Sequence, residues 1–145
     1  MNKADTIEYR IGALELTPGF LPYDDTEANN LEVDDTPFHL FIVSVRGNIA
    51  SLFVGSPRGH LALARMNSLN ADNVKGGGFC YIDPGHRLTL AGFSGSFGAI
   101  SKALAERFCD LLAPALKERS IPFEGTKAEP DERRINECWR AFTAQ

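Results

Sequence analysis

The sequence has no long apolar run and no excess of positive charge. No stretch approaches the roughly 18 apolar residues of a membrane-spanning helix, and the opening residues, MNKADTIEYR, lack the apolar core of a signal peptide. The 15 lysines and arginines are outnumbered by 19 aspartates and glutamates, which gives a net charge of -4. This balance disfavours binding to a nucleic-acid backbone. We therefore expect a cytoplasmic protein with no membrane or nucleic-acid partner; nothing indicates its oligomeric state.

Cysteines are few, and several catalytic motifs are missing. Cys80, Cys109 and Cys138 have no CxxC or other metal-type spacing, so we expect free, mostly buried thiols and no metal site. The chain also lacks the GxSxG elbow of serine hydrolases, the HExxH motif of zinc proteases and the Walker lysine motif of P-loop nucleotidases. The acidic segment 17–37 does not have the spacing of an EF-hand calcium loop, and we interpret it as a solvated loop.

The length and the apolar content are those of one ordinary domain. A chain of 145 residues, 43% of them apolar, can bury a core of its own, so we expect a single domain over residues 1–145. Strand-like and helix-like apolar patterns are mixed without repeats, which predicts an α+β fold: a mixed β-sheet flanked by helices, plus an additional C-terminal helix. The expected strands lie in 6–16, 38–45, 49–54, a hairpin within 76–93, and 121–128, and the expected helices begin at Ser56, near 97 and near 130.

Local signals add four details to this outline. Ser56 is predicted to cap the first helix, with Pro57 in its first turn. Pro84–Gly85 suits the two central positions of a type II turn at the tip of the hairpin. Pro114 is expected to kink the long helix or to end it early. Trp139 would pack the C-terminal helix on the body of the domain.

A glycine- and serine-rich turn, Ser94–Gly98, follows the second strand of the hairpin and precedes the long helix. Backbone N–H groups and hydroxyls at a helix N-terminus favour an anion such as phosphate. Glycine and serine are also common in ordinary strand-to-helix connections, for backbone reasons alone. The three glycines at 76–78 indicate a place where another segment of the chain comes close.

The three histidines have different surroundings in the predicted fold. His60 lies in the first turn of the first helix, where the helix dipole lowers the imidazole pKa and favours the neutral form that a base or nucleophile needs. His39 lies among apolar residues of a core strand, so it must be paired or face a cavity. His86, at the tip of the hairpin, is expected to be exposed.

The order of these features resembles the Janus/Ocnus family, which includes the eukaryotic protein phosphohistidine phosphatases. The resemblance covers roughly residues 38–127. Its most specific part is GGGFCYIDPGHRLTLAGFSGSFG, in which a triple glycine and two strands lead to a loop similar to the family's GYSxAYG. Upstream, Phe38–His39 corresponds to a Phe-Lys strand start, and Gly59–Leu61 to the segment with the catalytic histidine.

The resemblance implies a role for each matching residue. His60 would be the catalytic base or nucleophile toward phosphorus, and the backbone N–H of Leu61 would bind the phosphate. His39 stands where the family commonly has a phosphate-binding lysine, so a fixed positive charge is lost near neutral pH. Phe93 and Phe97 stand where tyrosines are usual. The remaining substrate-binding residues would supply hydroxyl and N–H donors or let the backbone approach the phosphate: Ser94, Gly95, Ser96, Gly76, Gly77 and Gly78.

The implied function is a phosphatase that needs no metal or cofactor and acts on phosphohistidine or a related phosphoramidate, in a phosphorylated protein or a small molecule. The P–N bond is labile, so one neutral imidazole and donors to the phosphoryl oxygens are sufficient. Two alternatives stay open. A non-catalytic module on the same fold could bind phosphate, another anion or a protein, which the histidine at position 39 favours. The chain could also be a purely structural or interaction protein whose 94–98 turn is empty.

Overall fold

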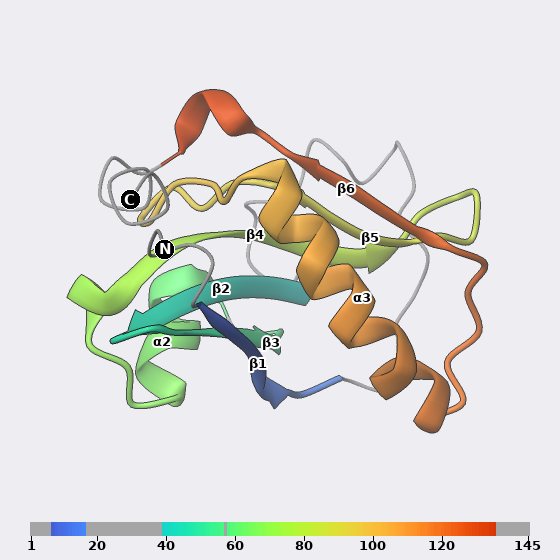
Figure 1. Ribbon diagram of the computed structural model, residues 1–145, viewed down its shortest axis with the longest axis horizontal. Coiled ribbons are helices and arrows are strands. Elements are labelled where there is room, and N and C mark those ends of the chain that lie inside the picture. The colour runs from blue at the N-terminus through green and yellow to red at the C-terminus, as the bar shows by residue number, and fades with distance from the viewer. Residues whose placement is uncertain (1–6, 17–38, 57, 136–145) are drawn as a thin grey trace.

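The computed structural model describes residues 7–16, 39–56 and 58–135. They form one six-stranded sheet in the order β1-β3-β2-β4-β5-β6 (Figure 1). The four central strands are antiparallel, whereas β1 joins β3 and β6 joins β5 in parallel. The elements are β1 (Glu8–Leu14), β2 (His39–Arg46), β3 (Ile49–Gly55), α2 (His60–Met66), η2 (Ala71–Asn73), β4 (Val74–Ile82), β5 (Leu88–Gly92), α3 (Lys102–Glu118), β6 (Thr126–Pro130) and η3 (Glu132–Arg134).

The predicted α+β fold with one mixed sheet and flanking helices is therefore confirmed. Each expected strand overlaps one in the structure, although β6 begins at Thr126, five residues after the expected start at 121. The acidic segment 17–37 and the helix expected around Trp139 lie outside the described residues, as does Cys138. Among the helices of the described ranges, none is long and apolar enough to cross a membrane.

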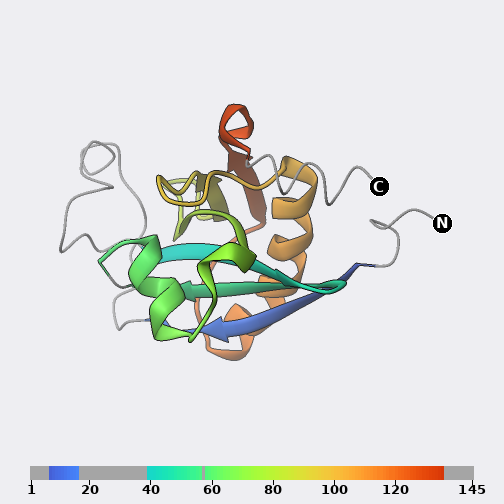
Figure 2. The same cartoon turned by 90° about the vertical axis from the view of Figure 1, so that its left-hand side faces the viewer.

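The two helices α2 and α3 cover opposite faces of the sheet (Figure 2). Side chains alternate between these faces along β2, the buried central strand: Phe41 and Val43 join the larger core under α3, and Leu40 and Ile42 join a smaller core under α2. This alternation decides on which side of the sheet each candidate residue lies.

The first helix begins later than predicted. Ser56 does not cap α2, because the helix starts at His60 and its N-cap position is Gly59. Gly59 has φ 106° and ψ 160°, a backbone conformation that residues with a Cβ rarely adopt. The glycine thus sets the direction from which the chain enters the helix at His60.

The long helix also differs from its prediction. It begins at Lys102 rather than near 97, and the hydroxyl of Ser101 accepts a hydrogen bond from the N–H of Leu104 at 3.3 Å. Pro114 lies inside α3 without ending it, since the helix continues to Glu118. Leu112 and Leu116, on either side of Pro114, are fully buried, and their packing outweighs the backbone hydrogen bond that the proline removes.

The hairpin turn between β4 and β5 is not type II. The N–H of His86 donates to the carbonyl of Asp83 at 2.9 Å, and the positive φ of 65° falls on His86, not on Gly85. The N–H of Asp83 also donates to the carbonyl of Arg87 at 2.9 Å, so the loop has three residues: a type I turn followed by a left-handed residue. His86 is exposed, as predicted.

Candidate functional site

His60 is the first residue of α2, and its imidazole lies against strand β4. Its Nε2 atom is 2.7 Å from the carbonyl oxygen of Gly78. Its ring meets that of Phe79 edge to face, with centroids 5.5 Å apart. Because a carbonyl oxygen can only accept, the hydrogen bond requires a proton on Nε2. In the neutral imidazole the lone pair is then on Nδ1, which makes Nδ1 the candidate base or nucleophile.

The absence of a side chain at Gly77 leaves room for the imidazole of His60. A Cβ at Gly77 would come within 3.2 Å of His60 Cδ2 and 2.5 Å of the carbonyl oxygen of Phe41. The same glycine donates its N–H to the carbonyl of Gly98 at 2.9 Å. Gly77 therefore contacts both the candidate catalytic histidine and the end of the Ser94–Gly98 turn, and brings together three segments that are far apart in the sequence.

The other two glycines of the run are also places of close approach. A Cβ at Gly76 would lie 2.7 Å from the carbonyl oxygen of Ala99, and one at Gly78 would lie 2.9 Å from Cε1 of Phe41. The prediction that another segment approaches the triple glycine is confirmed. The glycines are nevertheless part of β4 and do not merely precede it.

The Ser94–Gly98 turn is a closed loop. The N–H of Ser94 donates to the carbonyl of Gly98 at 2.9 Å, and the N–H of Gly98 donates back to Ser94 at 2.7 Å. The hydroxyl oxygen of Ser94 accepts from the N–H groups of Ser96 and Phe97, each at 3.2 Å. Ser94 and Phe97 are buried, while Gly95 and Ser96 form the exposed tip.

Phe97 places this loop on the same face of the sheet as α2. Its side chain belongs to the smaller core, together with Leu63 and Ala64 of α2 and Phe79 of β4. Since His60 contacts Phe79 as well, the histidine and the loop share one side of the molecule. Leu61 follows in the first turn of α2, is 39% exposed, and has a backbone N–H for which the helix itself supplies no acceptor.

The loop does not open onto a helix N-terminus, which corrects the expectation from the sequence. The helix after it begins only at Lys102, whose N–H donates to Oε1 of Glu132 at 2.8 Å. The N–H groups of Lys102 and Leu104 in the first turn of α3 therefore already have acceptors within the protein. An anion at the loop would be held by the N–H groups of the loop, two of which now point to the Ser94 hydroxyl.

His39 lies on the other face of the sheet. His39 lies two residues from Phe41 and four from Val43 along β2, so its side chain points to the same face of the sheet as theirs. It is also paired directly with Cys80 on β4. Phe41, Val43 and Cys80 all belong to the core under α3. The side chain is 1% exposed, and burial lowers the pKa of His39 to about 4. The imidazole is therefore neutral near pH 7 and is separated from His60 by the sheet, so we correct its assignment and leave it out of the site.

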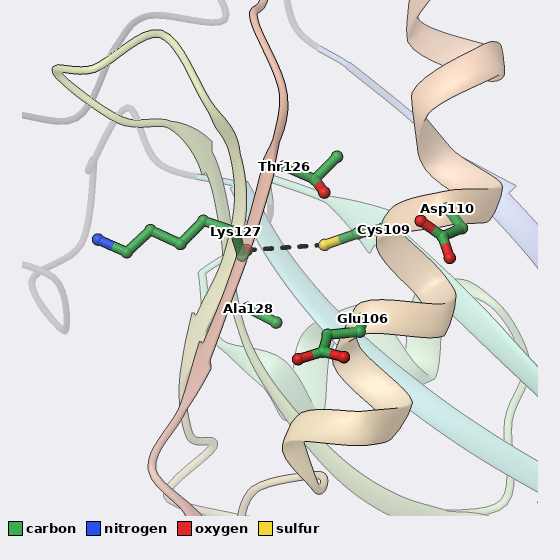
Figure 3. A pocket seen from close by; sticks show the side chains of 6 residues that line it. All are labelled: Glu106, Cys109, Asp110, Thr126, Lys127 and Ala128. Carbon is green, nitrogen blue, oxygen red and sulfur yellow. Dashed lines mark hydrogen bonds between the residues drawn. The ribbon is translucent and has the colours of Figure 1, made fainter.

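A pocket of about 310 Å³ lies between α3 and β6 (Figure 3), and its Cys109 and Ala128 belong to the core on the face of the sheet opposite α2. Two carboxylates, those of Glu106 and Asp110, line it, which makes it unsuitable for phosphate. Its Cys109 thiol donates to the carbonyl of Lys127 at 3.6 Å, and burial raises the thiol pKa to about 11. Cys109 is thus no nucleophile at neutral pH. Cys80 is buried and free as well, as predicted for both thiols.

One neighbour of the loop could not be recognised from the sequence. Arg134, just after β6, stacks on Phe93, with its Cζ 4.2 Å from the ring centroid. Phe93 is part of the Gly/Ser loop motif, but Arg134 belongs to no recognisable motif, and the contact depends on the sheet bringing β5 and β6 together.

Comparison of the chain with protein-family models, with curated proteins and with solved structures gives no significant match. The resemblance to the Janus/Ocnus family therefore rests on the sequence motifs alone.

Proposed function

We propose that this chain is a phosphatase that acts on phosphohistidine or a related phosphoramidate without a metal ion, with His60 as its catalytic residue. The observation that carries the proposal is the shared contact at Gly77, which receives the His60 ring on one side and hydrogen-bonds to the end of the Ser94–Gly98 loop. Histidine and loop also share the face of the sheet covered by α2. The sequence motifs that resemble the Janus/Ocnus family point to the same residues.

The chemistry follows from the tautomer of His60. With the Nε2 proton held by the carbonyl of Gly78, the lone pair of Nδ1 can attack phosphorus. A P–Nδ1 bond forms as the P–N bond of the substrate breaks, and the leaving nitrogen takes a proton. Water then hydrolyses the phosphorylated histidine to phosphate. If Nδ1 acts instead as a base, it takes the proton of a water that attacks phosphorus directly.

The Ser94–Gly98 loop would bind the phosphoryl oxygens. At its exposed tip the backbone N–H of Gly95 would bind the anion, and the N–H of Ser96 would turn to the anion from the Ser94 hydroxyl, which it contacts in the structure. The Ser94 hydroxyl would then donate its own proton to the anion. Preorganised donors of this kind stabilise the charge that develops on the oxygens during transfer. The backbone N–H of Leu61 would add one more donor beside His60.

A second candidate function is a non-catalytic module that binds phosphate or another anion at the same loop. The observation that favours it is the burial of His39 on the opposite face, which leaves the position of the family's phosphate-binding lysine without a charge at this site. Such a module would bind phosphate at the loop without turning over a substrate.

Two assays separate these functions. Hydrolysis of a phosphohistidine peptide and of phosphoramidate is followed by release of inorganic phosphate in the presence of a chelator. Thermal unfolding is recorded with increasing phosphate, because a ligand that binds only the folded state raises the unfolding temperature. Turnover supports the phosphatase, and stabilisation without turnover supports the binding module. If neither turnover nor stabilisation occurs, the loop is only a connection and both candidate functions are rejected.

A further inference from the structure

The segment after β6 is fastened to both ends of the Ser94–Gly98 loop. The N–H of Asp131 donates to the carbonyl of Gly92 at 3.0 Å, just before the loop. The N–H of Ala99, just after the loop, donates to the carbonyl of Arg134 at 2.9 Å. Segment 131–135 therefore lies along the base of the loop, as the path of the chain beyond β6 shows (Figure 1).

Two contacts hold the guanidinium of Arg134 at this base. Its Cζ lies 4.2 Å from the ring centroid of Phe93, the residue directly before Ser94. Its Nε donates to Oδ2 of Asp131 at 3.3 Å. The guanidinium has five N–H donors, of which the contact with Asp131 uses one. Because the side chain is 58% exposed, it remains accessible to a ligand.

We propose that Arg134 is a binding residue that supplies the fixed positive charge for a phosphoryl group at the Ser94–Gly98 loop; this inference rests on the proposed function of that loop. A loop of neutral N–H and O–H donors binds a phosphoryl dianion weakly in water, and a neighbouring guanidinium adds charge-assisted, bidentate hydrogen bonds. His39 cannot supply this charge, since it is neutral and lies on the other face of the sheet.

The side chains of Phe93 and Asp131 are positioning residues, which would act on the ligand through Arg134. The aromatic ring provides a flat surface on which the guanidinium stacks, and the carboxylate fixes its orientation through Nε. Phe93 stands where the resemblance leads one to expect a tyrosine, and a phenylalanine keeps the stacking surface while it removes the hydroxyl.

Arg133 provides a matched control. It is the neighbouring residue, it has the same charge, and its Nε donates to the same Asp131 carboxylate, at 3.0 Å. However, its side chain is 89% exposed. The variants Arg134→Gln and Arg133→Gln change the net charge equally, so a difference in phosphate affinity between them is not an effect of net charge.

The test is titration of the full-length chain with inorganic phosphate, followed through the amide NMR signals of Ser94–Gly98. Arg134→Gln should weaken phosphate binding by about tenfold, as expected for the loss of a charge-assisted hydrogen bond. Arg133→Gln should change it by less than about twofold, as expected for an exposed charge. Arg134→Lys should retain part of the affinity, and this variant serves as the test if Arg134→Gln does not fold.

Equal affinities of the Arg134→Gln and Arg133→Gln variants would overturn the role of Arg134 while leaving the proposed function of the loop in place. If phosphate does not shift the loop amides even in the wild type, both the role of Arg134 and the anion site are overturned. Binding that depends on Arg134 in a protein without phosphatase turnover would support the role of Arg134 and reject only the catalytic part of the proposed function.

Discussion

The Nε2 atom of His60 and the carbonyl oxygen of Gly78 are 2.7 Å apart, and this hydrogen bond fixes both the orientation and the tautomer of the imidazole. It requires Nε2 to carry a proton and leaves the lone pair of the neutral ring on Nδ1. The contact is possible because the neighbouring strand position is a glycine, over which the imidazole can lie.

Replacement of Gly77 by alanine should displace His60 and reduce phosphatase activity. The new Cβ would lie 2.5 Å from the carbonyl oxygen of Phe41 and 3.2 Å from His60 Cδ2, so the strand or the imidazole must move. We expect a loss of about 1–3 kcal/mol in the free energy of unfolding, as for other overpacked sites. Urea unfolding and the rate of phosphate release measure the two effects. A Gly77→Ala variant with wild-type stability and activity would show that His60 is not held in this way.

Replacement of Gly95 by valine should weaken phosphate binding and leave the fold unchanged. A Cβ at Gly95 would meet nothing within 4 Å, so the stability should change by less than about 0.5 kcal/mol. The bulkier side chain at the exposed tip should nevertheless obstruct an anion and weaken phosphate binding. Thermal unfolding with and without phosphate tests both statements, and unchanged phosphate affinity would place the ligand away from the tip.

The buried imidazole of His39 should make the stability of the protein depend on pH. Burial lowers its pKa to about 4 in the folded state, whereas the unfolded chain has the ordinary value near 6.5. Between these values the unfolded state binds more protons, so stability should fall as the pH drops from about 6.5 to about 4 and should level off above that window. Urea unfolding at several pH values should show this slope in the wild type and a smaller one in His39→Gln.

A lysine at position 39 should harm the fold without improving the site. The family resemblance alone would suggest that His39→Lys strengthens phosphate binding. The structure places this side chain under α3, where a charged ammonium group would be buried in the core. We expect a loss of more than about 2 kcal/mol in the free energy of unfolding. Tighter phosphate binding by a stable His39→Lys variant would contradict the placement of His39.

The sequence was sufficient for the strands because burial leaves an alternating apolar pattern in β1 and a continuous apolar run in β2, and for α3 because one face of that helix is apolar. The sequence was misleading at the start of α2 and in the hairpin turn, where the backbone conformation of single residues decides the structure. Ser56 has a common capping side chain, yet the chain enters α2 through the positive φ of Gly59. In the hairpin the left-handed residue is His86, although Gly85 has the stronger preference for that conformation.

The candidate site could be predicted only in part. His60 and the Ser94–Gly98 loop were found from the sequence, but their common contact at Gly77 depends on how the sheet is assembled. The alternation along β2 separates its side chains into two faces without showing which face α2 covers, and so it left the position of His39 open. Arg134 could not be identified from the sequence, because only the pairing of β5 with β6 brings it into contact with Phe93.

The central claim is that His60 performs the chemistry, and the most direct test compares two histidine variants in the hydrolysis of a phosphohistidine peptide. His60→Ala should reduce the rate of phosphate release by at least about a hundredfold, since a nucleophile or base is removed. His86→Asn, at an exposed position with φ 65° that asparagine tolerates, should keep the wild-type rate. Both variants should remain folded by circular dichroism. A folded His60→Ala protein that hydrolyses the peptide as fast as His86→Asn would contradict the account.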